Sequence, residues 1–351
     1  GSPLGVATPY EQEYVDPAGS AIGKYRITVT PPESGSTIVS VVSEGWTYRS
    51  PESVRTIRVR FRRPSWSEYA LLGNDMQRIG SGTDVSGKVF VNSGVHFDGV
   101  GHNTVSSAVP SYYDSDIDVR ATRAGVWTSW ANEYNTDMNS NVFLGGKRYP
   151  EPIIDFNGVT ADLSYIKSEA SAGGVVNDCG ASGCYFDDSS LGRHIILRDN
   201  GTFDIRGVGN FNSSLSGGAG FTNEITQYEG EWENYPIVDR GVIFVEGNVW
   251  LEGTLNGKHL TIVSANLVSS SIYNVYIQRD LVYGSHDGAS VLGVISQHDI
   301  ETTKNSNDTL RIDAALLAQN GRIGRSYYGN GKNNITIYGS LATNQRYGFA
   351  Y

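Results

Sequence analysis

The stretch from Gly241 to Ala265, GVIFVEGNVWLEGTLNGKHLTIVSA, alternates apolar and polar residues and is interrupted by glycine every few positions. Three runs within it, residues 242–245, 249–251 and 260–263, have the length and alternation of short β-strands. A ribbon of this kind builds either the hairpins of a β-sandwich or the successive coils of a β-solenoid. The residues after Ala265 help to distinguish these two folds.

Similar units continue almost to the C-terminus. Each has an alternating strand, then Asn, Asp or Gly, then a second strand, with an irregular period of roughly 20 to 25 residues. Asn and Gly tolerate the positive φ angles of tight corners, so the pattern favours a parallel β-helix. The run Asp313–Ala318, DAALLA, is apolar on both faces, which predicts a strand covered on both sides. An antiparallel sandwich is the alternative, and it would require clearer two-residue hairpin signals.

The composition agrees with an all-β chain. Its 351 residues include 42 Gly and 21 Tyr but only 2 Met, a balance typical of strands and turns and unlike that of helices. A hydrophobic content of 39% is sufficient for a buried core. The net charge of −10 disfavours a general polyanion-binding protein, because neutralising phosphates needs an excess of Lys and Arg. A local basic patch remains compatible with this charge.

The chain divides into regions that differ in their sequence pattern. Residues 1–79 predict a small β-region, in which Val54, Ile57, Val59 and Phe61 lie close to one strand face and arginines on the other. Residues 80–351 carry the solenoid pattern.

A loop-rich insertion is expected at about residues 110–235. We expect a helix within residues 158–170 of this insertion. We also expect a hairpin around Asp199-Asn200-Gly201.

Cys179 and Cys184 are the two cysteines of the chain, and only glycine, alanine and serine separate them. The spacing predicts a small disulfide-closed loop in an oxidising compartment, with a pair of reduced thiols as the alternative. No run approaches the roughly 20 apolar residues of a membrane span. No signal peptide is present, and Gly1-Ser2 resembles a vector-derived remnant, so we expect that a targeting segment has been removed.

Five stretches carry a family resemblance: RPSWSEYA (63–70), GKVFVNSGVHFDG (87–99), the stretch from Gly241 to Ala265, VLGVISQHDI (291–300) and IDAALLAQNGRIG (312–324). They resemble motifs of PilX-like minor pilins of type IV pili. The resemblance extends to the competence-associated, ComZ-like members, in which a β-solenoid is inserted into a pilin-like β-region. It implies that residues 1–79 are the pilin-like part and residues 80–351 the solenoid.

The resemblance also implies a cellular context. Pilins of this family are anchored in the inner membrane by a hydrophobic N-terminal helix before assembly, and this sequence lacks that helix. The chain also ends at NQRYGFAY, where further family sequence is expected. The protein would then be a minor component at the pilus tip, exposed at the cell surface, with other pilins as partners.

The expected function is to bind an extracellular ligand, most simply DNA for uptake. The alternative is an adhesin for a surface glycan or another cell. A β-helix carbohydrate-active enzyme is the third hypothesis, with Asp299, Asp308 and Asp313 as candidates by residue type only. We expect no catalysis, because no nucleophile elbow, H-E-x-x-H or phosphate-binding glycine loop is present.

Arg and Tyr interleave in the late, glycine-rich part of the chain, in a pattern suited to a nucleic acid backbone or a glycan. A solubilising loop at the solenoid end is the alternative. We call the candidate ligand-binding residues the late basic group; they are Arg311, Arg322, Arg325, Tyr327, Tyr328, Lys332 and Arg346.

Asp114, Asp116 and Asp118 follow one another at every second residue. Carboxylates in such a loop can ligate calcium through their oxygens, although the full EF-hand pattern is missing. The alternative is a solvated acidic edge. Apart from this calcium ion, we expect no cofactor.

Overall fold

The computed structural model describes residues 9–31, 38–62, 65–159, 162–213 and 220–349. The chain forms two compact units, Gly1–Ser65 and Trp66–Tyr351, which we call the first and second units. The boundary falls at Ser65. The strands at residues 71–73 and 77–79, which the sequence prediction assigned to the first region, pair with strands of the second unit.

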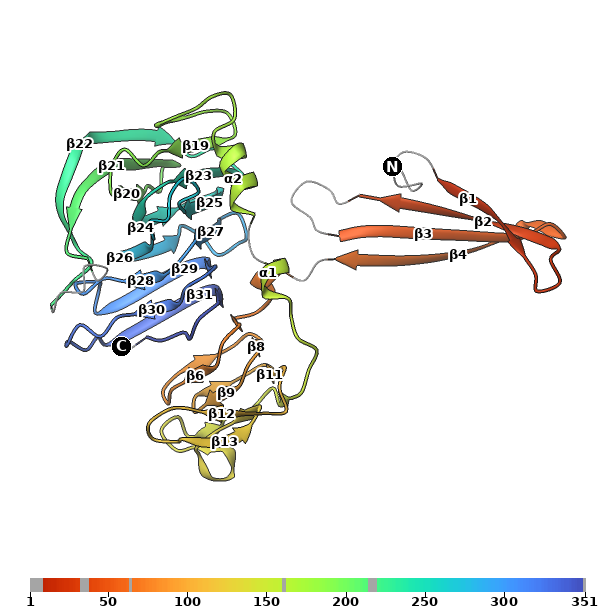
Figure 1. The fold of residues 1–351 in the computed structure, drawn as a ribbon, viewed down its shortest axis with the longest axis horizontal. Helices are drawn as coiled ribbons and strands as arrows, with labels where there is room; N and C mark the ends of the chain where they lie inside the picture. The colour runs from red at the N-terminus through yellow and green to blue at the C-terminus, as the bar shows by residue number, and fades with distance from the viewer. Residues whose placement is uncertain (1–8, 32–37, 63–64, 160–161, 214–219, 350–351) are drawn as a thin grey trace. The chain divides into compact units, whose positions relative to one another are not determined.

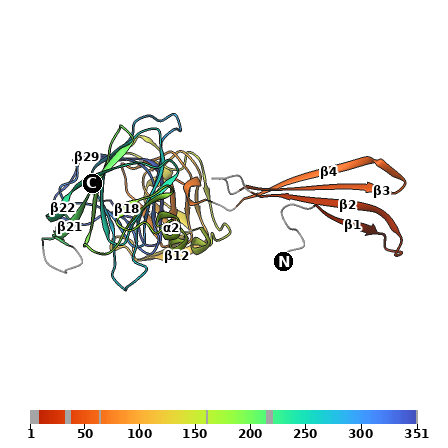
Figure 2. The same cartoon turned by 90° about the horizontal axis from the view of Figure 1, so that it is seen from above.

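The first unit is a four-stranded antiparallel sheet in the order of the chain (Figures 1 and 2). Its strands are β1 (Tyr10–Val15), β2 (Ala21–Thr30), β3 (Ile38–Thr47) and β4 (Ser50–Arg62). Among its described residues only Gly23 is buried. In the part that the structure describes, the unit is therefore a single-layer sheet without a core of its own.

The two faces of this sheet differ in polarity. Register pairs such as Val41↔Val59 and Val39↔Phe61 place β-branched and aromatic side chains on one face. Pairs such as Ser40↔Arg60 and Arg26↔Glu44 place polar and charged residues on the other face. This alternation confirms the predicted apolar face for Ile57, Val59 and Phe61 of β4, whereas the strand's period of two places Val54 on the opposite, arginine-bearing face. Ile57 and Phe61 remain 66% and 57% exposed, so the apolar face lies open to solvent.

The second unit is built on a ladder of parallel strands, which we call the main ladder. One arm contains β5 (Leu71–Gly73), β8 (Val89–Val91), β11 (Val105–Ser107) and β17 (Lys147–Arg148). The other arm contains β31 (Asn334–Thr343), β29 (Thr309–Ala318), β27 (Val291–Ser296), β25 (His259–Ser264), β23 (Gly241–Val245) and β19 (Gly183–Phe186). Parallel pairing rules out an antiparallel sandwich for these strands.

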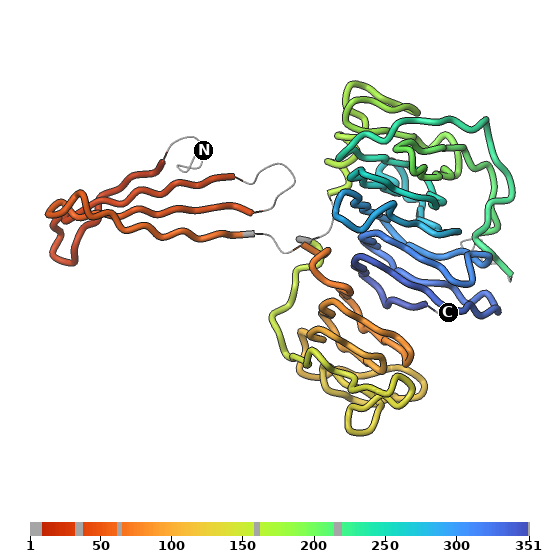
Figure 3. The backbone as a smooth tube through the Cα atoms, turned by 180° about the vertical axis from the view of Figure 1, so that it is seen from behind, coloured from red at the N-terminus to blue at the C-terminus, as the bar shows by residue number. Residues whose placement is uncertain are grey.

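The two arms meet where β31 pairs with β5, with Leu341 aligned to Leu71. The chain thus enters the main ladder in its middle and builds outward to β17. It then crosses to the far end at β19 and builds back until β31 closes on β5. Figure 3 shows the successive layers of the returning arm, from green to blue.

A second row of parallel strands runs beside the returning arm: β20 (Gly192–Leu197), β24 (Asn248–Leu255), β26 (Val275–Tyr283), β28 (Ile300–Thr302) and β30 (Ile323–Arg325). The antiparallel strands β21 (Thr202–Phe211) and β22 (Ile225–Pro236) extend this row beyond β20. The β20–β21 turn is the hairpin predicted at Asp199-Asn200-Gly201. Within the described residues, β22 pairs only with β21 and is an edge strand (Figure 2).

Shorter elements complete the second unit. Parallel pairs join β6 (Gln77–Ile79), β9 (Val95–Phe97) and β14 (Val126–Trp127), and also β7 (Asp84–Val85) and β10 (Val100–Gly101). Antiparallel pairs join β12 (Ser111–Asp114) to β13 (Ala121–Ala124), β15 (Tyr134–Asn135) to β16 (Ser140–Asn141), and β18 (Asp178–Cys179) to β19. The helices are η1 (Trp66–Glu68), η2 (Ala131–Glu133), α1 (Phe156–Val159) and α2 (Leu163–Ala170).

The core is a continuous column of aliphatic side chains inside the main ladder. Register places them one above another: Ile243, Ile262, Val294, Leu316, Leu341, Leu71, Val89 and Val105. All of them are buried in one cluster. Neighbouring residues on the opposite strand face, including Phe244, Val263 and Leu317, form a second cluster that packs against Phe156 and Leu163 of the helices. Asp313–Ala318 is accordingly covered on both sides, as predicted.

Strands account for most of the described secondary structure, which confirms the all-β class. The region of about 110–235 contains more regular structure than the predicted loop-rich insertion. Its later part supplies β18 to β22, of which β19 pairs with β23 and β20 with β24 of the two ladders. The predicted helix is present as α2, capped by Asp162, whose carboxylate accepts the backbone N–H of Tyr165. Cys179 and Cys184 form the predicted disulfide, across the antiparallel β18–β19 pair.

Candidate functional sites

The late basic group does not form a free cationic surface. Arg311 pairs with Asp313 at 2.9 Å, Arg322 with Glu301 at 2.5 Å, and Lys332 with Asp308 at 3.0 Å. Each of these cations is therefore paired with a carboxylate of the late strands or of the loops between them. Such pairs neutralise the charge that a polyanion would need to recognise.

The other members of the group are dispersed. Arg325 is buried, donates to the Asn330 side chain at 2.7 Å and stacks on the Tyr328 ring at 4.9 Å. The Tyr328 hydroxyl donates to the Thr302 carbonyl at 3.0 Å, and burial raises its pKa. Tyr327 is 88% exposed. Most residues of the late basic group therefore make structural contacts within the late strands and their loops.

Arg346 lies apart from the rest of the group and binds Asp116, with Nη2 and Oδ2 2.8 Å apart. Arg78 donates to Asp116 at 3.0 Å and to Asp118 at 2.7 Å. Hydrogen bonds from Arg346 first, and then from Arg78, hold the pKa of Asp116 below its ordinary value. Two of the three carboxylates predicted to bind calcium therefore converge on an arginine.

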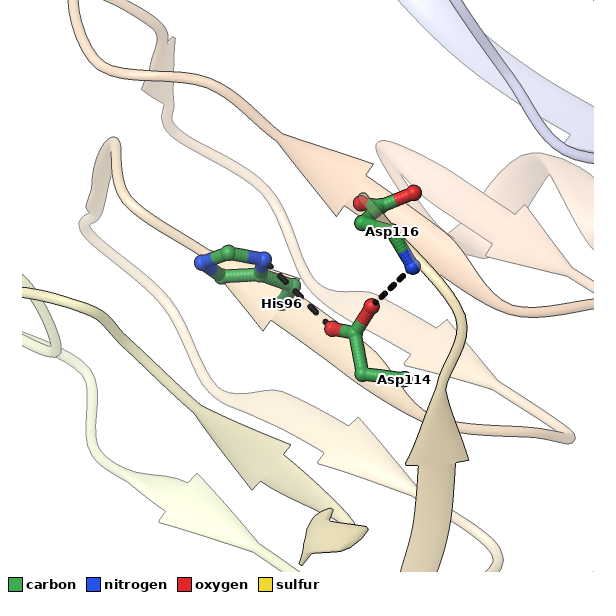
Figure 4. A group of neighbouring side chains, drawn as sticks. All are labelled: His96, Asp114 and Asp116. Atoms are coloured by element: carbon green, nitrogen blue, oxygen red, sulfur yellow. Dashed lines mark hydrogen bonds and ion pairs between the residues drawn. The ribbon is translucent and has the colours of Figure 1, made fainter. Parts of the chain in front are cut away.

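Asp114 lies toward the interior and is fully buried (Figure 4). It accepts hydrogen bonds from the Tyr112 hydroxyl at 3.1 Å and from the Asp116 backbone N–H at 3.1 Å. Its Oδ2 lies 3.5 Å from Nδ1 of His96 on β9. On a strand, their spacing would put all three aspartates on one side, but β12 ends at Asp114, and Asp116 and Asp118 lie in the turn that comes after it.

His96 is 1% exposed and lies between two carboxylates. Its Nε2 is 3.0 Å from Asp98, and Trp127 stacks on its ring at 3.9 Å. Neither ring nitrogen has a well-aligned hydrogen bond. Burial alone would raise the pKa of Asp98, but the adjacent His96 imidazole and the hydrogen bonds from Ser129 hold it well below its ordinary value. His96, Asp98 and Asp114 therefore form a buried cluster of ionisable side chains that connects β9 with the end of β12.

His96, Asp114 and Asp116 each offer a ligand atom, and these three atoms lie within 4.8 Å of one another. The donor set of imidazole and carboxylates would suit a divalent cation. However, Asp116 already binds two guanidinium groups, whose positive charge opposes a metal at this place. The residues present therefore fit an ion-pair network better than a metal centre.

A group of aromatic side chains lies on β22 and its neighbours, and we call it the aromatic surface. Tyr228 and Trp232 are 36% and 40% exposed, and both rings contact His194 of β20, at 5.9 and 5.4 Å between centroids. Arg206 of β21 stacks on Tyr228 at 4.9 Å. Exposed Trp and Tyr rings of this kind offer a large contact area with little conformational freedom to lose.

The polar partners of the aromatic surface are held in defined positions. His194 contacts the Tyr228 hydroxyl through Nδ1 and the Glu252 carboxylate through Nε2, both at 2.8 Å. Arg206 Nε donates to the Gly230 carbonyl at 3.0 Å. Rings, a guanidinium and a carboxylate on one sheet face are a combination that can stack on a sugar ring and hydrogen-bond its hydroxyls.

Sequence reasoning missed the aromatic surface. The signal was the run YEGEW, in which Tyr228 and Trp232 stand four positions apart around a glycine. Gly230 has a φ of +64° at a register irregularity between β21 and β22, a conformation that favours glycine. The enzyme candidates Asp299, Asp308 and Asp313 have separate partners, respectively His298, Lys332 and Arg311.

No family model and no curated protein matches the chain. A search of solved structures finds similarity to the competence-associated pilin ComZ from Thermus thermophilus, with 12% sequence identity and a TM-score of 0.32. The match covers 97% of this chain and 76% of that one. No helix among the described residues has the length and hydropathy needed to span a membrane.

Proposed function

We propose that this chain is a non-enzymatic component of a type IV pilus that binds a cell-surface glycan through its aromatic surface. The observation that supports a glycan ligand is the exposure of Trp232 and Tyr228 on the edge strand β22. Arg206 and Glu252, on neighbouring strands, lie beside these rings. The pilus context rests on the resemblance of several stretches to PilX-like minor pilins and on the first unit.

The first unit supports an assembly role because its sheet has one uncovered apolar face. A sheet buries its apolar face against another element in nearly every stable domain. Ile57, Val59 and Phe61 are all exposed at 43% or more. Packing against a neighbouring subunit or segment would remove this face from water.

Electrostatics favour a glycan over DNA. Glu229, Glu231 and Glu233 lie on the same strand as the aromatic surface, and Glu252 lies beside it. These carboxylates would repel a phosphate backbone, whereas they can accept hydrogen bonds from sugar hydroxyls. The cations first considered for DNA, in the late basic group, are largely paired with carboxylates.

Replacing Tyr228 and Trp232 together with alanine should weaken glycan binding by at least about tenfold, as loss of aromatic anchors does at other interfaces. The measurement is binding of the purified chain to an immobilised panel of neutral oligosaccharides. Tyr327→Ala is the matched control, because it removes an 88% exposed tyrosine of the late basic group. Unchanged binding by the double variant would reject the aromatic surface. Retention of duplex DNA that declines steeply with salt would instead favour DNA.

The assembly role has its own test. Ile57→Asp together with Val59→Asp should prevent recovery of the chain in sheared pilus fibres, because charges would replace the apolar contact. The isolated protein should keep its glycan binding, which resides in the second unit. Arg58→Asp and Arg60→Asp, on the other sheet face, form the control pair. Equal recovery of the Ile57/Val59 variant in fibres would contradict the proposal.

A further inference from the structure

A cavity of about 240 Å³ lies between the β21–β22 hairpin and the loop after β19. Tyr228 and Trp232 do not line it, but Arg206, which stacks on Tyr228, does, so the cavity adjoins the aromatic surface. The lining residues that matter here are Arg193, Asn177, Ser189, Phe186, Ile205 and the glutamates of β22.

Arg193 is the buried cation of this cavity. Its side chain is 9% exposed, and its guanidinium lies over the Phe186 ring at 5.8 Å. The hydrogen bonds recorded for it go to neutral oxygens at 3.2–3.3 Å: the Gly192 carbonyl, the Asn177 amide and the Ser189 hydroxyl. Among the described residues, the only carboxylate within 4.0 Å is Asp187, at that limit.

This arrangement leaves the charge of Arg193 poorly compensated. A buried guanidinium normally forms a short, bidentate pair with a carboxylate. Burial lowers the pKa of Arg193, although Asp187, Glu229 and Glu233 partly oppose the shift. A carboxylate entering the cavity would supply the missing partner.

Negatively charged side chains also line the cavity, opposite in sign to Arg193. Glu229, Glu231 and Glu233 contribute three carboxylates from β22, and all three residues are exposed. An anion alone would meet these carboxylates on its way to Arg193. A ligand with a carboxylate at one end and an ammonium group at the other would be attracted by both sets of residues.

The disulfide fixes the wall of the cavity. Cys179–Cys184 joins the two strands that end beside Asn177 and Phe186. Asn177 also exchanges hydrogen bonds with Asp187, donating from Nδ2 at 2.9 Å and accepting from the Asp187 backbone N–H at 3.1 Å. The acceptor beside Arg193 is thereby held in place before any ligand binds.

We propose that this cavity binds a free α-amino acid, with its carboxylate on Arg193 and its ammonium group toward the β22 glutamates. The volume is below the roughly 300 Å³ at which sites for drug-sized ligands begin, so it suits a single small molecule. The Ser189 hydroxyl could donate to the same carboxylate, and Phe186 and Ile205 would contact the aliphatic part. The cavity shares Arg206 and the β22 glutamates with the surroundings of the aromatic surface, but Arg193, its anchor, is not part of that surface.

The test is titration calorimetry of the full chain with alanine, serine and glutamate, and with propionate and ethylamine, which each lack one of the two charged groups. We expect at least one amino acid to bind and both truncated compounds to bind about tenfold or more weakly. Arg193→Gln should reduce affinity about 10- to 100-fold, and Glu229→Gln severalfold. Arg148→Gln, which removes an exposed arginine outside the cavity, should leave affinity unchanged.

Three outcomes would overturn the proposal: no heat with any amino acid at about 10 mM, equal binding of propionate, or full affinity in Arg193→Gln. Because Arg193 is buried, its variant must show the thermal unfolding and glycan binding of the parent chain. If Arg193→Gln does not fold, the test rests on Glu229→Gln, which changes an exposed residue. Unchanged amino-acid affinity in Glu229→Gln would reject the site. Glycan binding that persists while amino-acid binding is absent would reject this site without affecting the aromatic surface.

Discussion

Replacing Trp250 with alanine should lower the free energy of unfolding by about 3–5 kcal/mol, the range for deleting a large buried aromatic side chain. Trp250 of β24 is fully buried and packs against Phe211 and Tyr276, with ring centroids 4.9 and 5.1 Å apart. Its Nε1 donates to the Asn223 carbonyl at 2.9 Å. Alanine would leave both a cavity and a buried carbonyl without this donor. Urea-induced unfolding measures the loss.

Trp250→Phe is the control for this prediction. It keeps most of the ring volume but loses the Nε1 hydrogen bond, so the expected loss is smaller, about 1–3 kcal/mol. Because Phe211 and Asn223 flank the ends of β21 and β22, the alanine variant should also weaken glycan binding. A loss below about 1 kcal/mol in Trp250→Ala would contradict this packing of the three rings.

Replacing Asp98 with alanine should cost about 3–5 kcal/mol, because it leaves the partners of a buried charge without compensation. Asp98 lies 3.0 Å from His96 Nε2 and accepts hydrogen bonds from the Ser129 backbone N–H at 2.8 Å and the Ser129 hydroxyl at 2.7 Å. Alanine removes all of these acceptors at once. Chemical unfolding at neutral pH measures the effect, and Asp118→Ala, an exposed partner of Arg78, is the control that should change little.

The same variant should change the response to acid. The pKa of Asp98 is lower in the folded chain than in the unfolded chain. Its stabilisation is therefore complete above the unfolded value of about 4 and is lost as the pH decreases toward the folded value. The difference in unfolding free energy between the parent and Asp98→Ala should thus shrink below about pH 4. A constant difference down to the acid transition would show that this carboxylate is not the group responsible.

The sequence predicted those features that depend on local alternation. The strands within Gly241–Ala265, the two-sided burial of Asp313–Ala318 and the amphipathic β4 follow from a period of two residues. The Asp-Asn-Gly hairpin and the disulfide follow from turn chemistry and cysteine spacing. In each case neighbouring residues contain the information.

The candidate binding sites depend on contacts between segments that are far apart in the sequence. Local sequence patterns therefore could not predict which residues form them. Arg346 appeared to be a free cation in the late basic group, yet its partner is Asp116, far earlier in the chain. The aromatic surface likewise joins His194, Tyr228 and Glu252 from three strands. No local pattern indicates which acid will lie beside which base once the layers have stacked.

The pairing of β31 with β5 has a consequence for biosynthesis. Leu341 is synthesised 270 residues after Leu71 (341 − 71), so the central layer of the main ladder can form only once that whole stretch has been made. At about 5–20 residues per second, the early arm would wait many seconds with an unpaired strand edge. Such an edge can pair with another chain. Secretion or a chaperone that keeps nascent chains apart would therefore matter more for this protein than for a solenoid that grows from one end.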